Sequence, residues 1–331
     1  MSAIQSIAVL GAGSWGTALA VSVQSAGRDV KVWARSADLA ASLKNGLGNP
    51  AYLPGLDLPA LNASASLDHL DGAEAVLAAV PAQHARPILA ALAPHLKAGT
   101  PVILCAKGIE RGTLKLMQQV LGEALPHAVP AVLSGPSFAA DVARDLPTAV
   151  TLACADPDRG RALMQALGRE TFRPYWSGDM VGAEVGGAVK NVLAIACGMV
   201  EGLALGRSAH AALMTRGFAE MKRLATALGG RPETLAGLCG LGDLVLTCSS
   251  AKSRNMSFGK ALGEGRSAQD VLAERRAVTE GAATAPALAA LAARHGVDMP
   301  ICAAVNAILD GQITVAEAMD LLLSRPFKEE H

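Results

Sequence analysis

Aromatic side chains are scarce in this chain of 331 residues, where Phe, Trp and Tyr together make up 3%. Charged residues are also few, at 18%, and the 29 Lys and Arg residues balance the 29 Asp and Glu residues. Nucleic-acid-binding proteins usually carry a basic excess, so no nucleic-acid partner is expected. Hydrophobic residues make up 51%, which excludes intrinsic disorder, and the 34 glycines predict a core of aliphatic and small residues in close backbone contact.

Paired cysteines and long apolar runs are absent as well. The six cysteines form no CxxC motif, which predicts reduced, buried thiols and no metal site. The uncharged stretch at residues 124–140 contains three prolines and is too short to span a bilayer, so no membrane insertion is expected. The first apolar run, residues 7–10, ends in a glycine and does not resemble a signal peptide. These features predict a cytoplasmic protein.

Two kinds of hydrophobic pattern divide the chain near Gly178. Before it, short aliphatic runs predict strands at residues 7–10, 30–34, 75–80, 102–105, 131–133 and 148–153, with helices at 15–25, 85–96, 114–121 and 157–166. After it, apolar residues recur with helical spacing, and Thr314 with Glu317 predicts a capping box at the last helix. The fold class is therefore α/β: an N-terminal Rossmann-type, doubly wound, mostly parallel sheet in residues 1–178 and a C-terminal all-α domain in residues 179–331.

A glycine-rich turn follows the first predicted strand and opens the first predicted helix. Its sequence is GxGxxG, with Gly11, Gly13 and Gly16 at the three glycine positions. In a dinucleotide-binding site these glycines permit the tight turn, the approach of the pyrophosphate and the close packing of the helix on the strand. A chance cluster in a glycine-rich chain is the alternative, but the strand before it and the helix after it favour a dinucleotide site.

The end of the second predicted strand bears on the choice of dinucleotide. NAD-specific sites usually have Asp or Glu there to bind the ribose 2′-OH, whereas this chain has Arg35. An arginine can bind the 2′-phosphate of NADP, so NADP is the preferred cofactor in this interpretation and NAD a second one. An ordinary exposed arginine at a strand end is the alternative.

The stretch 181–205 carries the strongest chemical signal of the second half. It has helical spacing but carries Gly182, Gly186, Gly187 and Gly198, so another segment must approach this helix closely. Lys190 lies in the middle of the small-residue face, where burial would lower its pKa toward a range useful for acid–base catalysis. A lysine that extends to solvent from a surface helix is the alternative.

Two further segments of the second half carry polar residues of interest. In the first, a glycine-rich turn at residues 237–242 presents Asp243, which could orient a lysine ammonium or be a plain turn aspartate. In the second, Ser253 can cap a helix that begins with Arg254 and Asn255, and this helix terminus would suit an anion. A capped surface helix is the alternative for that segment.

The first half carries polar groups after two predicted strands, with Lys107 following one and Gly135, Ser137 and Ala139 following the other. With these segments, the chain resembles the bacterial-type NAD(P)-dependent glycerol-3-phosphate dehydrogenases along its whole length. The motifs GAGSWG, CAKGIE, GPSFA, VKN, LCGLGDLVLTC, SRN and VTEG occur in the family's order. At the last of these motifs the family often has VVEG, whereas this chain has Thr279 at the second of the four positions.

The resemblance implies reversible reduction of dihydroxyacetone phosphate to sn-glycerol 3-phosphate, which feeds glycerophospholipid synthesis. It implies that Lys190 is the catalytic proton donor and acceptor. It places the substrate on Lys107, Gly135, Ser137, Lys190, Asp243, Ser253, Arg254 and Asn255. It places the cofactor on Gly11, Gly13, Ser14, Trp15, Gly16, Arg35, Lys107, Ala139, Arg254, Val278 and Glu280.

Two other functions combine a similar pattern with different chemistry. A two-domain reductase of the β-hydroxyacid dehydrogenase type also has a Rossmann domain, a helical domain and a lysine before an asparagine, and differs in lacking the phosphate-binding segment. A non-catalytic NADP-binding sensor would need no buried lysine. The partner in the main interpretation is a phosphorylated three-carbon small molecule, and the apolar helices of the second domain can pack within the chain or form a homodimer face.

Overall fold

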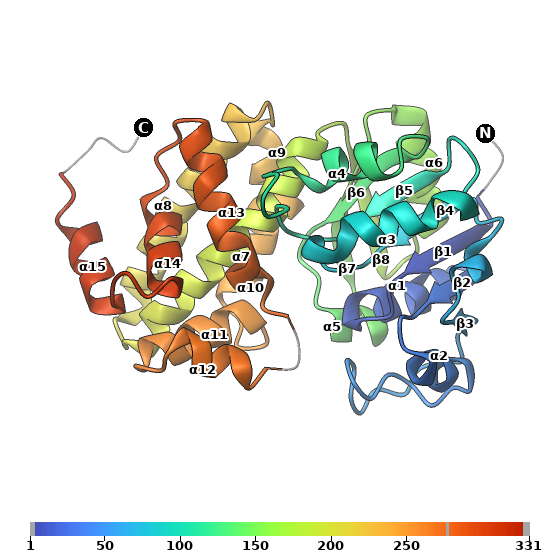
Figure 1. The fold of residues 1–331 in the computed structure, drawn as a ribbon, viewed down its shortest axis with the longest axis horizontal. Helices are drawn as coiled ribbons and strands as arrows, with labels where there is room; N and C mark the ends of the chain where they lie inside the picture. Colours follow the sequence, from blue (N-terminus) through green and yellow to red (C-terminus); the bar gives the residue numbers. More distant parts are fainter. Residues whose placement is uncertain (1–3, 276–277, 327–331) are drawn as a thin grey trace.

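The computed structural model describes residues 4–275 and 278–326, which form a sheet half and a helical half side by side (Figure 1). The strands of the sheet half are β1 (Ser6–Leu10), β2 (Asp29–Trp33), β3 (Ala63–Ser64), β4 (Ala75–Ala78), β5 (Pro101–Leu104), β6 (Val129–Ser134), β7 (Thr148–Ala153) and β8 (Phe172–Ser177). The α-helices between them are α1 (Ser14–Ser25), α2 (Ala37–Lys44), α3 (Ala85–Leu92), α4 (Met117–Ala124), α5 (Ala139–Ala143) and α6 (Pro157–Leu167).

One eight-stranded sheet runs in the order β3-β2-β1-β4-β5-β6-β7-β8. Its pairs are parallel except β6 with β7, where Leu133 lies opposite Leu152 in an antiparallel register. The strand order reverses at β1, because β2 lies on one side of it and β4 on the other. Ligands of such sheets bind outside the carboxyl ends of the strands at that point. The prediction of a doubly wound, mostly parallel sheet is confirmed.

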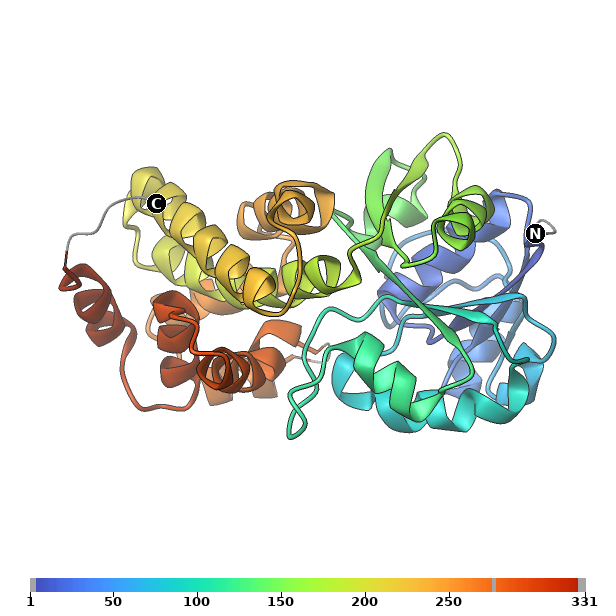
Figure 2. The ribbon, with the colours of Figure 1, turned by 90° about the horizontal axis from the view of Figure 1, so that it is seen from above.

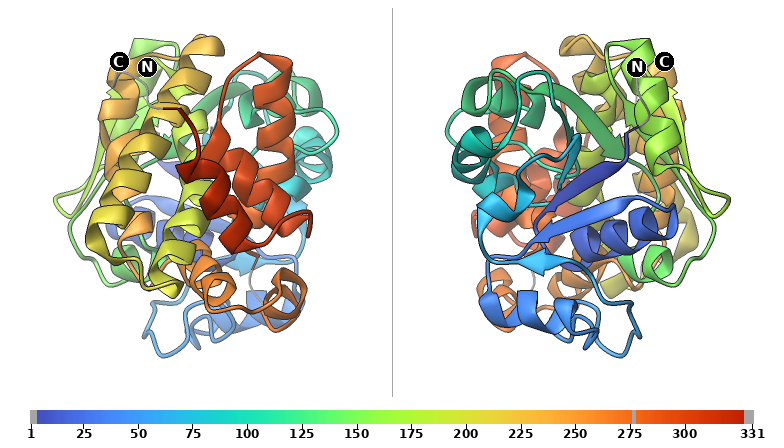
Figure 3. Two further views of the ribbon diagram at one scale, coloured as in Figure 1. Left: turned by 90° about the vertical axis from the view of Figure 1, so that its left-hand side faces the viewer. Right: turned by 90° about the vertical axis from the view of Figure 1, so that its right-hand side faces the viewer.

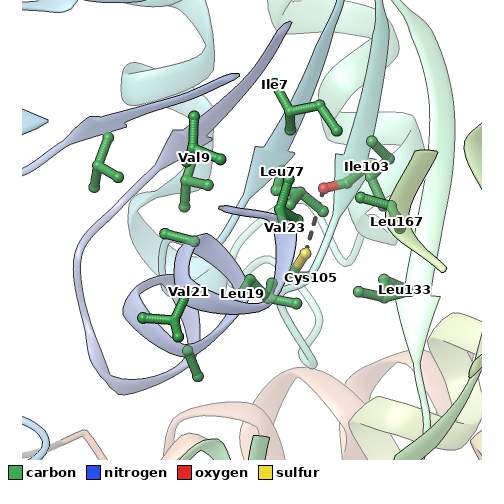
Figure 4. Close-up of a cluster of buried hydrophobic side chains, with 14 of the residues drawn as sticks. Ile7, Val9, Leu19, Val21, Val23, Leu77, Ile103, Cys105, Leu133 and Leu167 are labelled. Carbon is green, nitrogen blue, oxygen red and sulfur yellow. Dashed lines mark hydrogen bonds between the residues drawn. The ribbon is translucent and has the colours of Figure 1, made fainter. Parts of the chain in front are cut away.

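Aliphatic side chains bury the sheet on both faces, as parallel sheets require. Val9, Leu77 and Ile103 are fully buried at neighbouring positions of β1, β4 and β5, and Leu19 of α1 packs in the same cluster (Figure 4). Cys105 belongs to this cluster, and all six cysteines are free and buried, as the scattered pattern predicted. Since few aromatic residues are present, helix and sheet meet through branched aliphatic chains at short range.

The described residues of the second half form helices joined by loops and contain no strand, which confirms the all-α prediction. Its helices are α7 (Met180–Gly202), α8 (Gly206–Ala227), α9 (Pro232–Ala236), α10 (Asp243–Cys248), α11 (Arg254–Gly263), α12 (Ala268–Ala273), α13 (Glu280–Arg294), α14 (Pro300–Leu309) and α15 (Val315–Leu323). Helix α7 is the central one, and α8, α10, α11 and α13 pack around it (Figures 2 and 3). It is long and apolar enough to cross a membrane, but 89% of its apolar window is buried inside the protein.

Glycines on α7 allow the close approach that the sequence predicted. A Cβ on Gly198 would collide with the carbonyl oxygen of Met256, and one on Gly259 of α11 would collide with that of Ile195. Helices α7 and α11 are therefore in backbone contact. This packing fixes the first turn of α11 relative to the middle of α7.

Several predicted boundaries were wrong, for local physical reasons. Strand β8 was missed because it contains Pro174 and exposes Tyr175 and Trp176, the composition of an edge strand. The two-residue strand β3 was also missed. The helix predicted at 114–121 begins instead at Met117, since Leu114 has a φ of 62°. The strand predicted at 75–80 ends at residue 78, and the helix predicted at 85–96 ends at residue 92 in a 3₁₀ turn. The capping box at Thr314 is confirmed.

Candidate active site between the sheet and the helical half

The glycine-rich turn connects β1 to α1 at the reversal point of the sheet. Gly11 has a φ of 111°, and a Cβ there would lie 2.9 Å from the carbonyl oxygen of Ala79. A Cβ on Gly16 would collide with the carbonyl oxygen of Gly11. Both positions therefore require glycine for steric reasons, as the fingerprint predicted.

The space beside Gly13 is open. A Cβ built on Gly13 meets no atom within 4 Å, and as the N-cap of α1 this residue offers no side chain to the free backbone N–H groups. Such N–H groups and the helix dipole favour an anion. Ser14 and Trp15 form the first turn of α1 beside this space. Ala139 begins α5, which packs against α1, so this predicted cofactor residue lies on a neighbouring element.

Arg35 follows β2 and is exposed to solvent. Between β2 and α2 the chain contains only Ala34, Arg35 and Ser36, and the Ser36 hydroxyl caps α2 by accepting a hydrogen bond from the Leu39 N–H. No carboxylate lies within 4 Å of the Arg35 guanidinium among the described residues, so the structure leaves this cation accessible to a ligand.

Lys190 is buried in the middle of α7, with 7% of its surface exposed. Its Nζ lies 2.6 Å from Oδ1 of Asp243 and donates to the Thr247 hydroxyl at 2.8 Å. Burial lowers the pKa of Lys190 to about 8, and the Asp243 carboxylate opposes this change by stabilising the ammonium. The lysine thus titrates near neutral pH in a protected position, and the surface-lysine alternative is wrong.

Asp243 joins two lysines that come from the two halves of the molecule. Its other oxygen, Oδ2, lies 2.6 Å from Nζ of Lys107, and the aspartate itself is 1% exposed. Gly187 of α7 makes room for this contact, because a Cβ there would lie 3.1 Å from Cγ of Lys107. The glycine-rich segment before Asp243 is one π-helical turn (Leu238–Gly242) that leads into α10, and not the simple turn predicted from its glycines.

The loop after β6 brings Gly135 and Ser137 to the same place. Gly135 has a φ of 148°, and a Cβ there would lie 2.9 Å from Cα of Val150, so a larger residue would strain the loop. Its carbonyl oxygen accepts hydrogen bonds from Nζ of Lys107 at 3.0 Å and from the Ser137 hydroxyl at 3.1 Å. Lys107 is thereby held between the β6 loop and α10.

The predicted anion-binding segment opens α11 as expected. The Ser253 hydroxyl accepts a hydrogen bond from the Met256 N–H at 3.2 Å and so caps the helix. Arg254 is the exposed first residue of the helix. Asn255 is 8% exposed, and its amide donates to Oδ1 of Asn191 and accepts from the Gly281 N–H, each at 2.9 Å. Its Oδ1 is thus engaged inside the protein, and only its second amide N–H is left for a ligand.

Residues Val278 and Glu280 lie where α13 begins, on the helical half. Val278 is 45% exposed, and Glu280 lies close to Gly108 of the loop after β5. Burial raises the pKa of the Glu280 carboxyl to about 7, and the positive charge of Arg254 opposes this change. The start of α13 therefore faces the loop that carries Lys107.

Sequence reasoning did not assign two residues that complete this cluster. Thr247 contacts Lys190, and it lies one helical turn after Asp243, a spacing that puts both on one helix face. Asn191 donates to the Lys107 carbonyl oxygen at 3.3 Å and accepts from Asn255, so it connects the β5 loop to α11. Among residues 4–275 and 278–326, no group of three or more His, Cys, Asp or Glu could hold a metal ion.

Comparison with known proteins covers both halves of the chain. The model of the N-terminal part of the NAD-dependent glycerol-3-phosphate dehydrogenases matches residues 6–159, and that of the C-terminal part matches residues 179–320. The chain is 59% identical to the glycerol-3-phosphate dehydrogenase [NAD(P)+] of Maricaulis maris over 100% of this chain and 99% of the relative. It is 58% identical to that of Caulobacter vibrioides, with coverage of 98% and 99%.

A solved structure extends the likeness to the fold. The crystal structure of glycerol-3-phosphate dehydrogenase from Coxiella burnetii has a TM-score of 0.92 and 40% identity, and covers 97% of this chain and 99% of that one. These matches favour neither the β-hydroxyacid dehydrogenase alternative nor the sensor. The chain belongs to the NAD-dependent glycerol-3-phosphate dehydrogenase family.

Proposed function

We propose that the protein reduces dihydroxyacetone phosphate reversibly to sn-glycerol 3-phosphate, with NADPH or NADH, for glycerophospholipid synthesis. The observation that carries this proposal is the cluster in which Lys190 and Lys107 share the two oxygens of Asp243. It lies between the sheet half, which we assign to dinucleotide binding (residues 1–178), and the helical half, which we assign to the substrate (residues 179–331).

Lys190 is the proton donor in this proposal. Gly11–Gly16, Arg35 and Ala139 would hold the dinucleotide, which would supply or accept the hydride. Reduction of a ketone also needs a proton at the carbonyl oxygen, and a buried ammonium with a pKa of about 8 can give it and take it back in the reverse direction. Asp243 fixes the direction of the Lys190 N–H bonds, while Lys107 adds positive charge beside the oxygen.

The first turn of α11 is the proposed site for the substrate phosphate. Arg254 offers a planar, charged donor at the helix N-terminus, and the second amide N–H of Asn255 adds a neutral one. Ser253 keeps this turn in place as its cap. Binding free energy from the phosphate can then orient a substrate of only three carbons at Lys190.

Three finer statements also belong to the proposal. Arg35 follows β2 where an NAD site usually has an acidic residue, and no described carboxylate lies within 4 Å of it, which supports a preference for NADP over NAD. The six buried free cysteines support a cytoplasmic location, where thiols stay reduced. A homodimer is the proposed assembly, since α15 exposes Leu321 and Leu323, and light scattering of the purified protein tests it.

The deciding experiment measures NADPH and NADH consumption with dihydroxyacetone phosphate. We expect turnover with both cofactors, and little with dihydroxyacetone, which lacks the phosphate. Turnover with hydroxy acids or keto acids but not with dihydroxyacetone phosphate would overturn the proposal in favour of the β-hydroxyacid reductase.

A further inference from the structure

The loop after β5 carries Lys107 and follows an irregular path to α4. An isolated bridge joins Ile109 to Leu116 in this loop, and Leu114 has a φ of 62°. Ile109 is 1% exposed and packs in the hydrophobic core of the helical half, although the loop starts from the sheet. Because the loop is not part of a helix or a sheet, its path depends on the hydrogen-bond partners that other segments supply to its backbone.

Gln83 supplies two of these partners. It follows β4, in a 3₁₀ turn at Ala82–His84, and its side chain is half-buried. Its Nε2 donates to the Ile109 carbonyl oxygen at 2.8 Å, and its Oε1 accepts from the Arg111 N–H at 3.0 Å. One side chain thus pairs a C=O and an N–H two residues apart, as a neighbouring parallel strand would. Gln83 belongs to neither the proposed substrate site nor the proposed dinucleotide site.

Ala82, the residue before Gln83, packs against the same stretch of the loop. A Cβ on Gly108 would lie 2.9 Å from Cβ of Ala82, so the backbone at Gly108 lies directly against the loop after β4. Ala82 and Gln83 therefore fix residues 108–111 by packing and by hydrogen bonds. This stretch begins immediately after Lys107.

The position of the Lys107 ammonium depends on where its backbone is held. Its Nζ reaches Oδ2 of Asp243 at 2.6 Å and the Gly135 carbonyl oxygen at 3.0 Å, through a flexible four-carbon stem. Both partners belong to other elements, so a shift of the loop backbone moves Nζ away from them. Asn191 also holds this backbone, but its hydrogen bond to the Lys107 carbonyl oxygen is long, at 3.3 Å. The two bonds of Gln83 are shorter, and they hold the loop from the sheet half.

Lys107 in turn acts on Lys190. Burial lowers the pKa of Lys190, the Asp243 carboxylate opposes this change, and the positive charge of Lys107 lowers the pKa further. Cys248 is the other titratable group that acts on Lys190. If Lys107 moves away from Asp243, the pKa of Lys190 rises, because a like charge is lost and the carboxylate interacts with Lys190 alone.

We propose that Gln83 is a positioning residue for the reaction: its amide fixes the loop after β5 at Ile109 and Arg111 and thereby holds the Lys107 ammonium against Asp243. Gln83 acts through the backbone of the loop and not by contact with the substrate. This inference rests on the proposed function, in which Lys107 and Asp243 bind the substrate.

Steady-state kinetics of Gln83→Met test the proposal, because methionine has a similar length and shape and makes neither hydrogen bond. Two ordinary hydrogen bonds together correspond to about a tenfold effect, so kcat/KM for dihydroxyacetone phosphate should fall about tenfold. The descending limb of kcat against pH should move to higher pH, since the pKa of Lys190 rises when Lys107 withdraws.

Gln119→Met is the matched control. The Oε1 of Gln119 accepts from the Leu116 N–H at 3.0 Å, so the same substitution removes a hydrogen bond at the other end of the same loop. This variant should have a lower Tm, but kcat/KM should stay within about twofold of the wild type and the pH limb should not move. Equal losses of kcat/KM in the two variants, or an unmoved limb in Gln83→Met, would overturn the proposal, because both results are those of a merely structural role.

Crystal structures of the wild type and of Gln83→Met test the same step without turnover. We expect Nζ of Lys107 to lie beyond about 4 Å from Oδ2 of Asp243 in the variant, against 2.6 Å with Gln83 present. An unchanged ion pair would overturn the proposal whatever the kinetics show. Absence of turnover in the wild type would instead refute the proposed reaction, and the place of Lys107 in the variant would still decide the role of Gln83.

Discussion

Replacing Asp243 by Asn should shift the pH at which the enzyme loses activity. In the wild type Asp243 accepts hydrogen bonds from two ammonium groups, at 2.6 Å each. An asparagine has the same shape but no charge, and it turns one N–H₂ edge toward one of the lysines. Burial lowers the pKa of Lys190, and the Asp243 carboxylate opposes this change. Without that carboxylate the pKa of Lys190 should fall further.

The size of the effect follows from the pKa of about 8 for Lys190. At pH 7.5 such a group is roughly three quarters protonated, and reduction of a ketone needs this protonated form. An opposite charge in contact typically changes a pKa by about 1 to 3 pH units. A decrease of about two units leaves roughly 3% of Lys190 protonated at pH 7.5, so kcat for reduction should fall about 25-fold there.

The assay is kcat for NADPH-dependent reduction of dihydroxyacetone phosphate between pH 5.5 and 9. In the variant the descending limb should move to lower pH, and activity should recover toward pH 5.5. Thr247→Val is the matched control, because it removes an uncharged partner of Lys190 and should move the limb much less. A loss of the same factor at every pH, with an unmoved midpoint, would refute the electrostatic argument and assign Asp243 a positioning role only.

Four further outcomes are expected. Lys190→Ala should lower kcat by roughly a hundredfold or more, the range for loss of a positioned general acid, with dinucleotide affinity by fluorescence titration nearly unchanged. Arg254→Ala should reduce kcat/KM for dihydroxyacetone phosphate by about 2 to 4 kcal/mol but barely affect dihydroxyacetone, and Arg254→Lys should recover only part of the loss. Arg35→Asp should shift the preference in steady-state kinetics from NADPH toward NADH, because a carboxylate repels the 2′-phosphate. Burial raises the pKa of Glu184 to about 8, so folding stability should fall as pH rises from about 5 through 8, and Glu184→Gln should flatten this dependence of Tm.

Each of these outcomes has a result that contradicts it. Near-normal kcat in Lys190→Ala at neutral pH would place the proton donor elsewhere. Equal losses with both substrates in Arg254→Ala would mean that this arginine acts on the cofactor or the fold. Equal losses with both cofactors in Arg35→Asp would remove the argument for the 2′-phosphate. An unchanged pH slope of Tm in Glu184→Gln would show that this carboxyl, which accepts the Gln118 N–H at 2.8 Å, titrates with the same pKa in the folded and unfolded states.

Local features of this protein could be predicted from the sequence because they depend on neighbouring residues. The strand before Gly11 and the helix after it follow from a short aliphatic run and a glycine turn, and the capping box at Thr314 follows from a spacing of three residues. The glycines of α7 predicted a close neighbour but not which one. Strand β8 escaped prediction because an edge strand with Pro174 lacks the alternation that marks a buried strand.

Only the tertiary structure brought the site together. Lys107 and Asp243 are 136 residues apart and Lys190 and Asp243 are 53 apart, and no local period relates them. The pKa of Lys190 depends on its burial, on the carboxylate of Asp243 and on the charge of Lys107, so it could not be derived from the residues around it in the chain. The hydrogen bonding of Asn255 could not be derived from its sequence neighbours either, because its Oδ1 accepts from the N–H of Gly281. Hydrophobic pattern and turn chemistry act between residues that are close in the sequence. Catalytic geometry depends instead on how separate elements pack, and this packing is the sum of many weak contacts over the whole fold.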